Sequence, residues 1–125
     1  MSHFATITTQ IKDLAALQSA CSELSLTVVA DTTARGYSTN TVHGEQVIRL
    51  KGPYDIAVNR QPDGTFGLTT DWWDGHVEKE VGPNYGRLLQ LYAVHKATAE
   101  TRKRGHSVQR KAGQHGAIKL MIGGI

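Results

Sequence analysis

The order of hydrophobic patterns along this 125-residue chain predicts an α+β domain. Short stretches that alternate apolar and polar residues, as half-buried strands do, lie before, between and after two stretches with helical spacing. Two helices can cover only one face of a sheet, so we expect a two-layer sandwich with a mainly antiparallel sheet and both helices on one face. A decorated ferredoxin-like arrangement is one way to connect such elements. The length fits one α+β domain over residues 1–125.

The first predicted strand and helix lie near the N-terminus. Residues 4–11 alternate loosely and are rich in β-branched side chains. Asp13 follows and can cap a helix, because its carboxylate can accept the free amide hydrogens of the first turn. Apolar residues then recur at steps of three and four: Leu14, Leu17, Cys21 and Leu24. This spacing predicts a helix that buries Cys21, so we expect the thiol to be structural and not reactive.

The middle of the chain predicts a run of strands. Four stretches alternate or are rich in β-branched residues: 26–30, 45–51, 54–59 and 66–72. The last two flank the turn-forming residues 61–64, which predicts a β-hairpin with one apolar face. Residues 31–44 are rich in Thr, Ser, Asn and Gly, with Tyr37 as the only aromatic side chain, and are expected to form an irregular connection.

The longest predicted helix begins near Pro83, where Asn84 could cap it, and continues to Gly105. The tail that follows contains two predicted strands joined by a turn at residues 113–116. The predicted core combines the apolar faces of all these elements: Ile7, Leu14, Leu17, Cys21, Leu24, Val28, Ile56, Val58, Phe66, Leu68, Leu88, Leu91, Tyr92, Ile118 and Leu120.

The net charge of +3 is unevenly distributed. Residues 1–95 carry seven Lys/Arg and ten Asp/Glu, whereas residues 96–125 carry seven Lys/Arg and one Glu. A basic region of this kind could attract a phosphate backbone or an acidic partner. Its cations could also simply be solvated at a helix end, where the helix dipole favours them. The candidate nucleic-acid-binding residues are Arg102, Lys103, Arg104, Arg110 and Lys111, with Lys96 beside them.

The sequence composition also indicates in which cellular compartment the protein is expected. The chain contains no apolar stretch of about 18–20 residues and no charged-then-apolar export signal at its start, so we expect no membrane insertion. One cysteine cannot form a disulfide within the chain, which is compatible with a reducing cytosol. We therefore expect a cytoplasmic protein.

Residue types that carry chemistry are present but scattered. The densest group, Asp71, Asp74, His76, Glu78 and Glu80, could bind a divalent cation, although a solvated acidic loop is the preferred interpretation. His95 lies on the apolar stripe of the long helix and is expected to be a hydrogen-bonded histidine, with a general base as the alternative. No Gly-x-Ser-x-Gly elbow or nucleotide-binding loop occurs. We therefore expect no enzyme activity, no metal and no cofactor.

Trp72 and Trp73 are adjacent, so on a strand their side chains point to opposite faces and only one can join the core. The other could anchor a protein partner or stack on a base. The leading hypothesis is a non-enzymatic protein-interaction domain, an adaptor or assembly factor, whose partner is another protein or a second copy. A nucleic-acid-binding module is the alternative, and a metal-binding protein the third.

Motifs across nearly the whole chain carry a family resemblance: Met1-Ser2-His3-Phe4 with Ile7, Thr9, Ile11 and Leu14, then Tyr54-Asp55-Ile56, Thr70-Asp71, the 88–92 helix and Gly116-Ala117-Ile118-Lys119-Leu120. They resemble the plastid and cyanobacterial hypothetical chloroplast reading frame thirty-five family, a domain of unknown function also found in other bacteria. Members usually end in a basic-aromatic pair, whereas this chain ends in Ile122-Gly123-Gly124-Ile125. The resemblance implies a compact intracellular domain and supplies no catalytic residues.

Overall fold

A computed structural model describes residues 3–124 and confirms the α+β class. Met1, Ser2 and Ile125, which belong to the predicted domain range, lie outside the described residues. In chain order the elements are β1 (Phe4–Thr8), α1 (Leu14–Glu23), β2 (Thr27–Arg35), β3 (Thr41–Arg49), β4 (Asp55–Arg60), β5 (Phe66–Asp71), η1 (Trp73–Gly75), α2 (Glu78–Val81), η2 (Pro83–Tyr85), α3 (Gly86–Lys103), β6 (Ser107–Ala112), η3 (Gln114–Gly116) and β7 (Ile118–Gly123).

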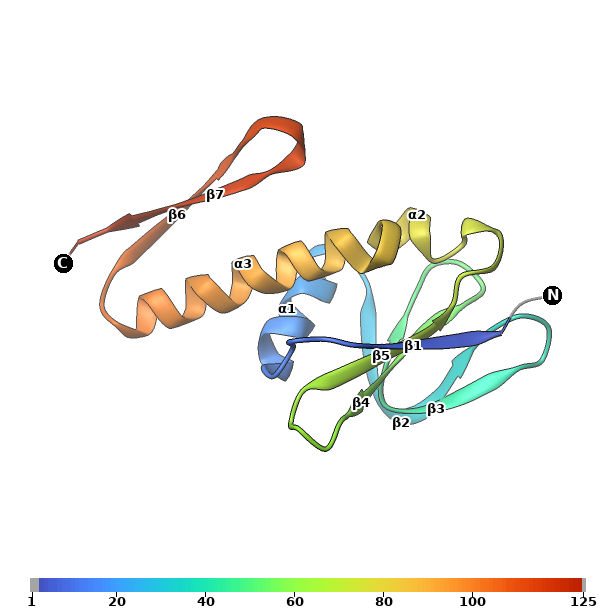
Figure 1. The fold of residues 1–125 in the computed structure, drawn as a ribbon. Coiled ribbons are helices and arrows are strands. Elements are labelled where there is room, and N and C mark those ends of the chain that lie inside the picture. The colour runs from blue at the N-terminus through green and yellow to red at the C-terminus, as the bar shows by residue number, and fades with distance from the viewer. Residues whose placement is uncertain (1–2, 125) are drawn as a thin grey trace.

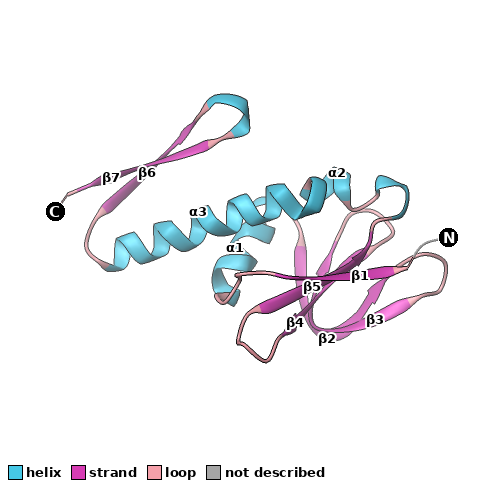
Figure 2. Cartoon of the chain, in the orientation of Figure 1, coloured by secondary structure: helices cyan, strands magenta, loops and turns pink. Residues whose placement is uncertain are grey.

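Five strands form an antiparallel sheet in the order β1-β5-β4-β3-β2, and β6 and β7 pair with each other in a separate hairpin. The two long helices lie on one side of the sheet, and the hairpin stands beside α3 (Figure 1). Figure 2 shows the same division between the helices and the strands. The ferredoxin-like variant is not confirmed. That arrangement interleaves two β-α-β units, whereas here β2 to β5 follow one another as a meander.

The core lies between the helices and the sheet. Asp13 caps α1 as predicted, because its Oδ1 accepts a hydrogen bond of 3.0 Å from the backbone N–H of Ala16. Cys21 is fully buried, and this burial raises its pKa to about 12. Two predicted core residues are wrong. Ile7 is 37% exposed because β1 is an edge strand, and Leu120 is only partly buried because β7 does not join the main sheet.

The other predicted core residues pack as expected, either buried or partly buried against the cluster: Leu14, Leu17, Leu24, Val28, Ile56, Val58, Phe66, Leu68, Leu88, Leu91, Tyr92 and Ile118. Sequence patterns did not identify several further members, among them Val77, Val81 and Tyr85 in the short segments before α3. The core therefore includes the connection between β5 and α3. From the sequence, the acidic part of this connection was interpreted as a solvated loop.

The expectation of an irregular connection at residues 31–44 is wrong. β2 continues to Arg35 and β3 begins at Thr41, so only residues 36–40 form the tip of this hairpin. The outer halves of both strands pack on the sheet face away from the helices, where Ala34, Val47 and Ala57 form a second small buried cluster. Because this cluster needs only three small apolar side chains, most of the outer half can be polar.

Gly44 allows this close packing. A Cβ atom at residue 44 would lie 2.5 Å from the backbone oxygen of Gln46 and 2.9 Å from a methyl carbon of Val47. Real Cβ atoms do not approach backbone oxygens so closely, so no larger residue fits without a shift of the strand.

The long helix also begins later than predicted. Asn84 does not cap α3, because both Asn84 and Tyr85 adopt left-handed backbone conformations and the helix begins at Gly86. Its C-terminal end and the turn at residues 114–116 agree with the sequence prediction. None of the helices within residues 3–124 is both long enough and apolar enough to cross a lipid bilayer.

Candidate functional site

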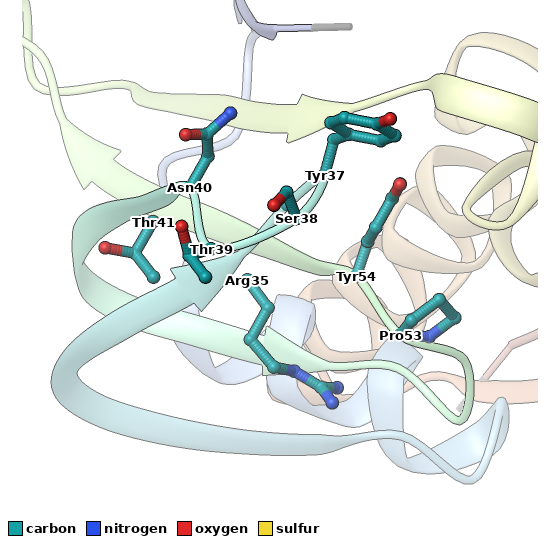
Figure 3. A pocket seen from close by; sticks show the side chains of 9 residues that line it. Arg35, Tyr37, Ser38, Thr39, Asn40, Thr41, Pro53 and Tyr54 are labelled. Atoms are coloured by element: carbon teal, nitrogen blue, oxygen red, sulfur yellow. The ribbon is translucent and has the colours of Figure 1, made fainter.

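The clearest surface feature lies at one end of the sheet, where the β2–β3 tip, the start of β4 and the end of β5 meet. A shallow pocket of about 460 Å³ opens here, lined by Arg35, the tip residues 36–40, Thr41, Pro53 and Tyr54. Tyr37 and Tyr54 lie on one side of this pocket, and Arg35 extends from β2 below them (Figure 3). These side chains come from segments that are well separated in the sequence.

A buried carboxylate holds the end of β2 and the end of β3 against β4. The side chain of Asp55 has no exposed surface, and it accepts three hydrogen bonds from Arg35, through the backbone N–H at 2.9 Å and through Nε and Nη2 at 2.8 Å each. Arg49 donates a fourth from Nη1 at 2.8 Å. Burial acts to raise the pKa of Asp55, but the hydrogen bonds from Arg35 and Arg49 outweigh it, so the pKa lies below its ordinary value. Asp55 is therefore ionised and fixes the geometry of this end.

A second buried carboxylate positions two exposed aromatic residues. Asp71 is 1% exposed, and its Oδ2 accepts a hydrogen bond of 3.1 Å from the backbone N–H of Tyr37, while its Oδ1 accepts one of 2.9 Å from the backbone N–H of Trp73. The rings of Tyr37 and Trp73 make an edge-to-face contact with centroids 5.7 Å apart. Tyr37 is 41% exposed and Trp73 is 43% exposed. One carboxylate thus fixes the backbone of both members of a solvent-facing aromatic pair.

Further polar side chains lie beside this pair. Asp74 follows Trp73, and its side chain is 72% exposed, with His76 Nε2 at 3.8 Å as a distant neighbour. The His76 ring packs edge-to-face on Tyr54, with centroids 5.1 Å apart. Burial raises the pKa of Tyr54, and the nearby Asp71, Tyr37 and Asp74 raise it further through their negative charge. We refer to Tyr37, Trp73 and Asp74 as the aromatic end.

The two tryptophans separate as predicted, although the strand ends one residue before them. Trp72 is partly buried against the main core and packs edge-to-face on Tyr85, with ring centroids 4.8 Å apart. Trp73 begins η1 and faces solvent. Of the two predicted anchors, only Trp73 is positioned to touch a partner with its ring.

The predicted basic residues fall into two groups. Arg102 and Arg110 line a pocket of about 180 Å³ together with His95, Thr98 and Val108. The remaining candidates are exposed and lie outside this pocket: Lys103, Arg104 and Lys111. The structure therefore brings together two arginines that are eight residues apart, one at the end of α3 and one on β6.

One carboxylate, Glu23 at the end of α1, connects the pocket to the rest of the molecule. Its oxygens accept hydrogen bonds from Arg110 Nη1 and Nη2 at 2.8 Å and 3.1 Å, and His95 Nε2 lies 2.8 Å from Oε1. The hydrogen bond from Arg110 holds the pKa of Glu23 below its ordinary value. His95 is thus a hydrogen-bonded histidine that ties α3 to α1, as the sequence suggested.

The acidic group around His76 does not converge on one point. Asp71 binds the backbone of Tyr37 and Trp73, and Glu80 accepts hydrogen bonds from the backbone N–H groups of Lys51 and Gly52. Among the residues that the structure describes, no three His, Cys, Asp or Glu side chains lie close enough together to hold one metal ion.

Sequence reasoning missed the role of the two residues that organise this end: Asp55 was named only within a family motif, and Asp71 only within that motif set and the acidic group. Asp55 alternates with apolar neighbours as an ordinary strand residue would, and its partner Arg35 lies 20 positions away. The one available signal was Tyr37, a single aromatic side chain within a polar segment.

Comparison with known proteins identifies the family to which the chain belongs. No curated protein and no solved structure matches the chain. A family model described as "Protein of unknown function (DUF1257)" matches residues 20–121, which include both the aromatic end and most of the C-terminal hairpin. The chain therefore belongs to the DUF1257 family of proteins of unknown function.

Proposed function

We propose that this protein is a non-enzymatic protein-interaction domain that binds its partner through the aromatic end. The observation that carries the proposal is the exposed pair of Tyr37 and Trp73, whose backbone N–H groups are both held by the buried carboxylate of Asp71. Tyrosine and tryptophan dominate the binding energy of many protein interfaces, because each buries a large rigid surface on association.

The way in which the pair is held also favours binding. Ordering a flexible surface on association costs free energy, and a surface that is fixed beforehand avoids much of this cost. Asp71 and the edge-to-face contact between the rings restrict Tyr37 and Trp73 before any partner arrives.

The test is capture of partners from a cell extract by the immobilised protein. We expect Trp73→Ala and Tyr37→Ala to lose proteins that the wild type retains. The matched control is Ile7→Ala, because Ile7 is also an exposed apolar residue, at 37%, but lies on edge strand β1. Circular dichroism establishes that each variant is folded. Recovery of the same proteins at the same yield by all three variants would disprove the proposal.

A nucleic-acid-binding module is the second candidate, and one specific observation favours it. Arg102 and Arg110 line one pocket at the end of α3, within a region that carries seven Lys/Arg and one Glu. Phosphate binding by such a surface predicts an affinity that falls steeply as salt is raised. Replacing Arg102, Lys103 and Arg104 by alanine should then abolish retention of a labelled RNA or DNA oligonucleotide. Binding that is absent at low salt would remove this candidate.

We also infer that the protein works in the cytoplasm and belongs, within DUF1257, to the plastid and cyanobacterial reading frame thirty-five group. The single buried thiol of Cys21 supports a reducing compartment. The motifs around Tyr54 and Gly116 support the narrower group.

A further inference from the structure

Four of the six large apolar side chains that are exposed within residues 3–124 lie in two places, and the other two, Ile7 and Val29, lie on β1 and β2. Tyr37 and Trp73 lie at the aromatic end, and Met121 and Ile122, which are 47% and 61% exposed, lie on β7. Residues 1–95 carry an excess of three negative charges, and residues 96–125 an excess of six positive charges. These totals describe segments of the sequence. The charged residues that follow Trp73 in the chain are the exposed Asp74, Glu78 and Lys79, and those on the Met121 face of the hairpin are Lys111 and Lys119.

One face of the C-terminal hairpin carries an unusual cross-strand pair. Lys111 and Lys119 lie directly opposite each other in the β6–β7 register, and Gln109 and Met121 form the next pair on the same face. Like charges directly opposite each other destabilise a strand pair. Neither lysine has an ion-pair partner among residues 3–124, and all four side chains are exposed. We refer to these four residues as the hairpin face. Within residues 3–124, no carboxylate pairs with either of its two ammonium groups.

The aromatic end supplies the groups that the hairpin face lacks. Asp74 presents a carboxylate that is 72% exposed beside the ring of Trp73, and Glu78 is exposed on the following turn. A methionine sulfur makes favourable contacts with aromatic rings. Met121 and the two lysines thus match Trp73 and Asp74 in chemistry, with an apolar contact beside an ionic one on both surfaces.

The two surfaces of one chain lie apart in the folded structure. Trp73 precedes α2, close to the start of α3, and the 18 residues of α3 span about 27 Å. The turn of the hairpin lies against the first half of α3, where Gln90 Nε2 donates a hydrogen bond to the Gly116 carbonyl. Met121 pairs with Gln109 near the start of β6, so it lies at the opposite end of the hairpin from the turn. This end of the hairpin lies toward the end of α3 that is remote from α2 (Figure 1).

We propose that the chain self-associates head to tail, with the hairpin face of one copy bound to the aromatic end of a second copy. This inference rests on the proposed function and names its partner. The contact joins two different surfaces, so it leaves one free surface of each kind on a dimer, and larger rings or open chains form as concentration rises. The contact is small, so association is weak and depends on concentration.

Mixing two variants, each with one damaged surface, tests this arrangement. The head variant combines Trp73→Ala with Asp74→Asn, and Asn tolerates the left-handed backbone of residue 74. The tail variant combines Lys119→Glu with Met121→Ala, and a glutamate opposite Lys111 favours the hairpin fold. Sedimentation velocity over a range of concentrations measures the mass of each variant alone, of the mixture and of the wild type.

We expect the wild type to form species larger than a dimer at high concentration and each variant alone to be monomeric. The equimolar mixture should form a two-chain species and nothing larger, because only one intact surface of each kind remains. Raising the salt from about 0.05 to about 0.5 M should weaken the wild-type association several-fold, since the ionic contact is exposed. Ile7→Ala should behave as the wild type.

A mixture that stays monomeric, a wild type that is monomeric at every concentration, or a single variant that associates as the wild type does would each overturn the inference. Failure of this inference is distinguishable from failure of the proposed function. If the chain is monomeric and Trp73 is still needed to capture other proteins, the partner is another protein and the proposed function stands.

Discussion

The aromatic end and the C-terminal hairpin are attached to the molecule in different ways. At the aromatic end, two carboxylates that are almost fully buried act as acceptors: Asp55 for Arg35 on β2 and Arg49 on β3, and Asp71 for the tip at Tyr37 and for η1 at Trp73. The hairpin is attached through partly exposed groups, chiefly Arg110 to Glu23, and through partial burial of Ile118. Buried charged contacts are costly to break, whereas exposed ion pairs contribute little.

This difference predicts two kinds of stability within one chain. The aromatic end should unfold together with the core, because its anchors lie on β4 and β5 in the middle of the sheet. The hairpin should open locally with a lower free energy, as segments with few buried contacts do. One small protein then combines a fixed binding surface, the aromatic end, with a more adjustable one, the C-terminal hairpin.

The largest expected effect is the loss of the Asp55 carboxylate. Asp55→Ala leaves Arg35 and Arg49 without their shared partner and should lower the free energy of unfolding by about 3 kcal/mol. Urea denaturation followed by tryptophan fluorescence measures this change. The control is Asp31→Asn, because the Asp31 side chain is 86% exposed and its one ion pair within residues 3–124 is with His43. Equal stability of the two variants would show that the buried network does not hold this end.

The pH dependence of stability sharpens the same point. The folded pKa of Asp55 lies below its ordinary value of 3.8, so the unfolded state takes up the proton first as the solution is acidified. The contribution of Asp55 is therefore complete above the ordinary value and is lost as the pH falls through the folded pKa. We expect the difference in unfolding free energy between the wild type and Asp55→Asn to shrink progressively below about pH 4. A constant difference across this range would contradict the assignment.

A smaller loss is expected at Gly44, where β3 passes close to the second cluster. Gly44→Ala forces a Cβ against the Gln46 backbone oxygen and should cost about 2 kcal/mol. The matched control is Gly86→Ala, because a Cβ at residue 86 meets no atom within 4 Å. Thermal unfolding of the two variants measures the difference. If Gly44→Ala is as stable as Gly86→Ala, the tip is not tightly packed on the sheet.

The packing of the helices on the sheet also explains which strands could be predicted from the sequence and which could not. Strands covered by the helices show clear alternation, so the hairpin at 54–72 and its apolar face could be predicted. Residues 31–35 and 41–44 lie outside this cover and need few apolar side chains, so their strands carry no such pattern.

The candidate site shows a similar division. The divergence of Trp72 and Trp73 was predicted from strand alternation, and the two rings do separate, but for another reason: β5 ends at Asp71, Trp72 is not extended (φ −86°, ψ 9°) and Trp73 begins η1. The contact of Asp71 with Tyr37 joins residues 34 positions apart and depends on how far the β2–β3 tip reaches across the sheet. No local pattern encodes that distance.

The smallest effect on global stability is expected at the hairpin. Glu23→Ala removes the acceptor shared by Arg110 and His95 and should lower the free energy of unfolding by less than about 1 kcal/mol, because all three side chains are partly exposed. Its local effect should be larger: hydrogen exchange of the β6 and β7 amides should accelerate several-fold, while the amides of β4 and β5 remain unchanged. Glu100→Ala, which removes the exposed pair with Lys96 on α3, is the matched control and should leave hairpin exchange as it is. Equal acceleration in both sheets would mean that the hairpin opens only when the whole molecule unfolds, and the two regions would then share one stability.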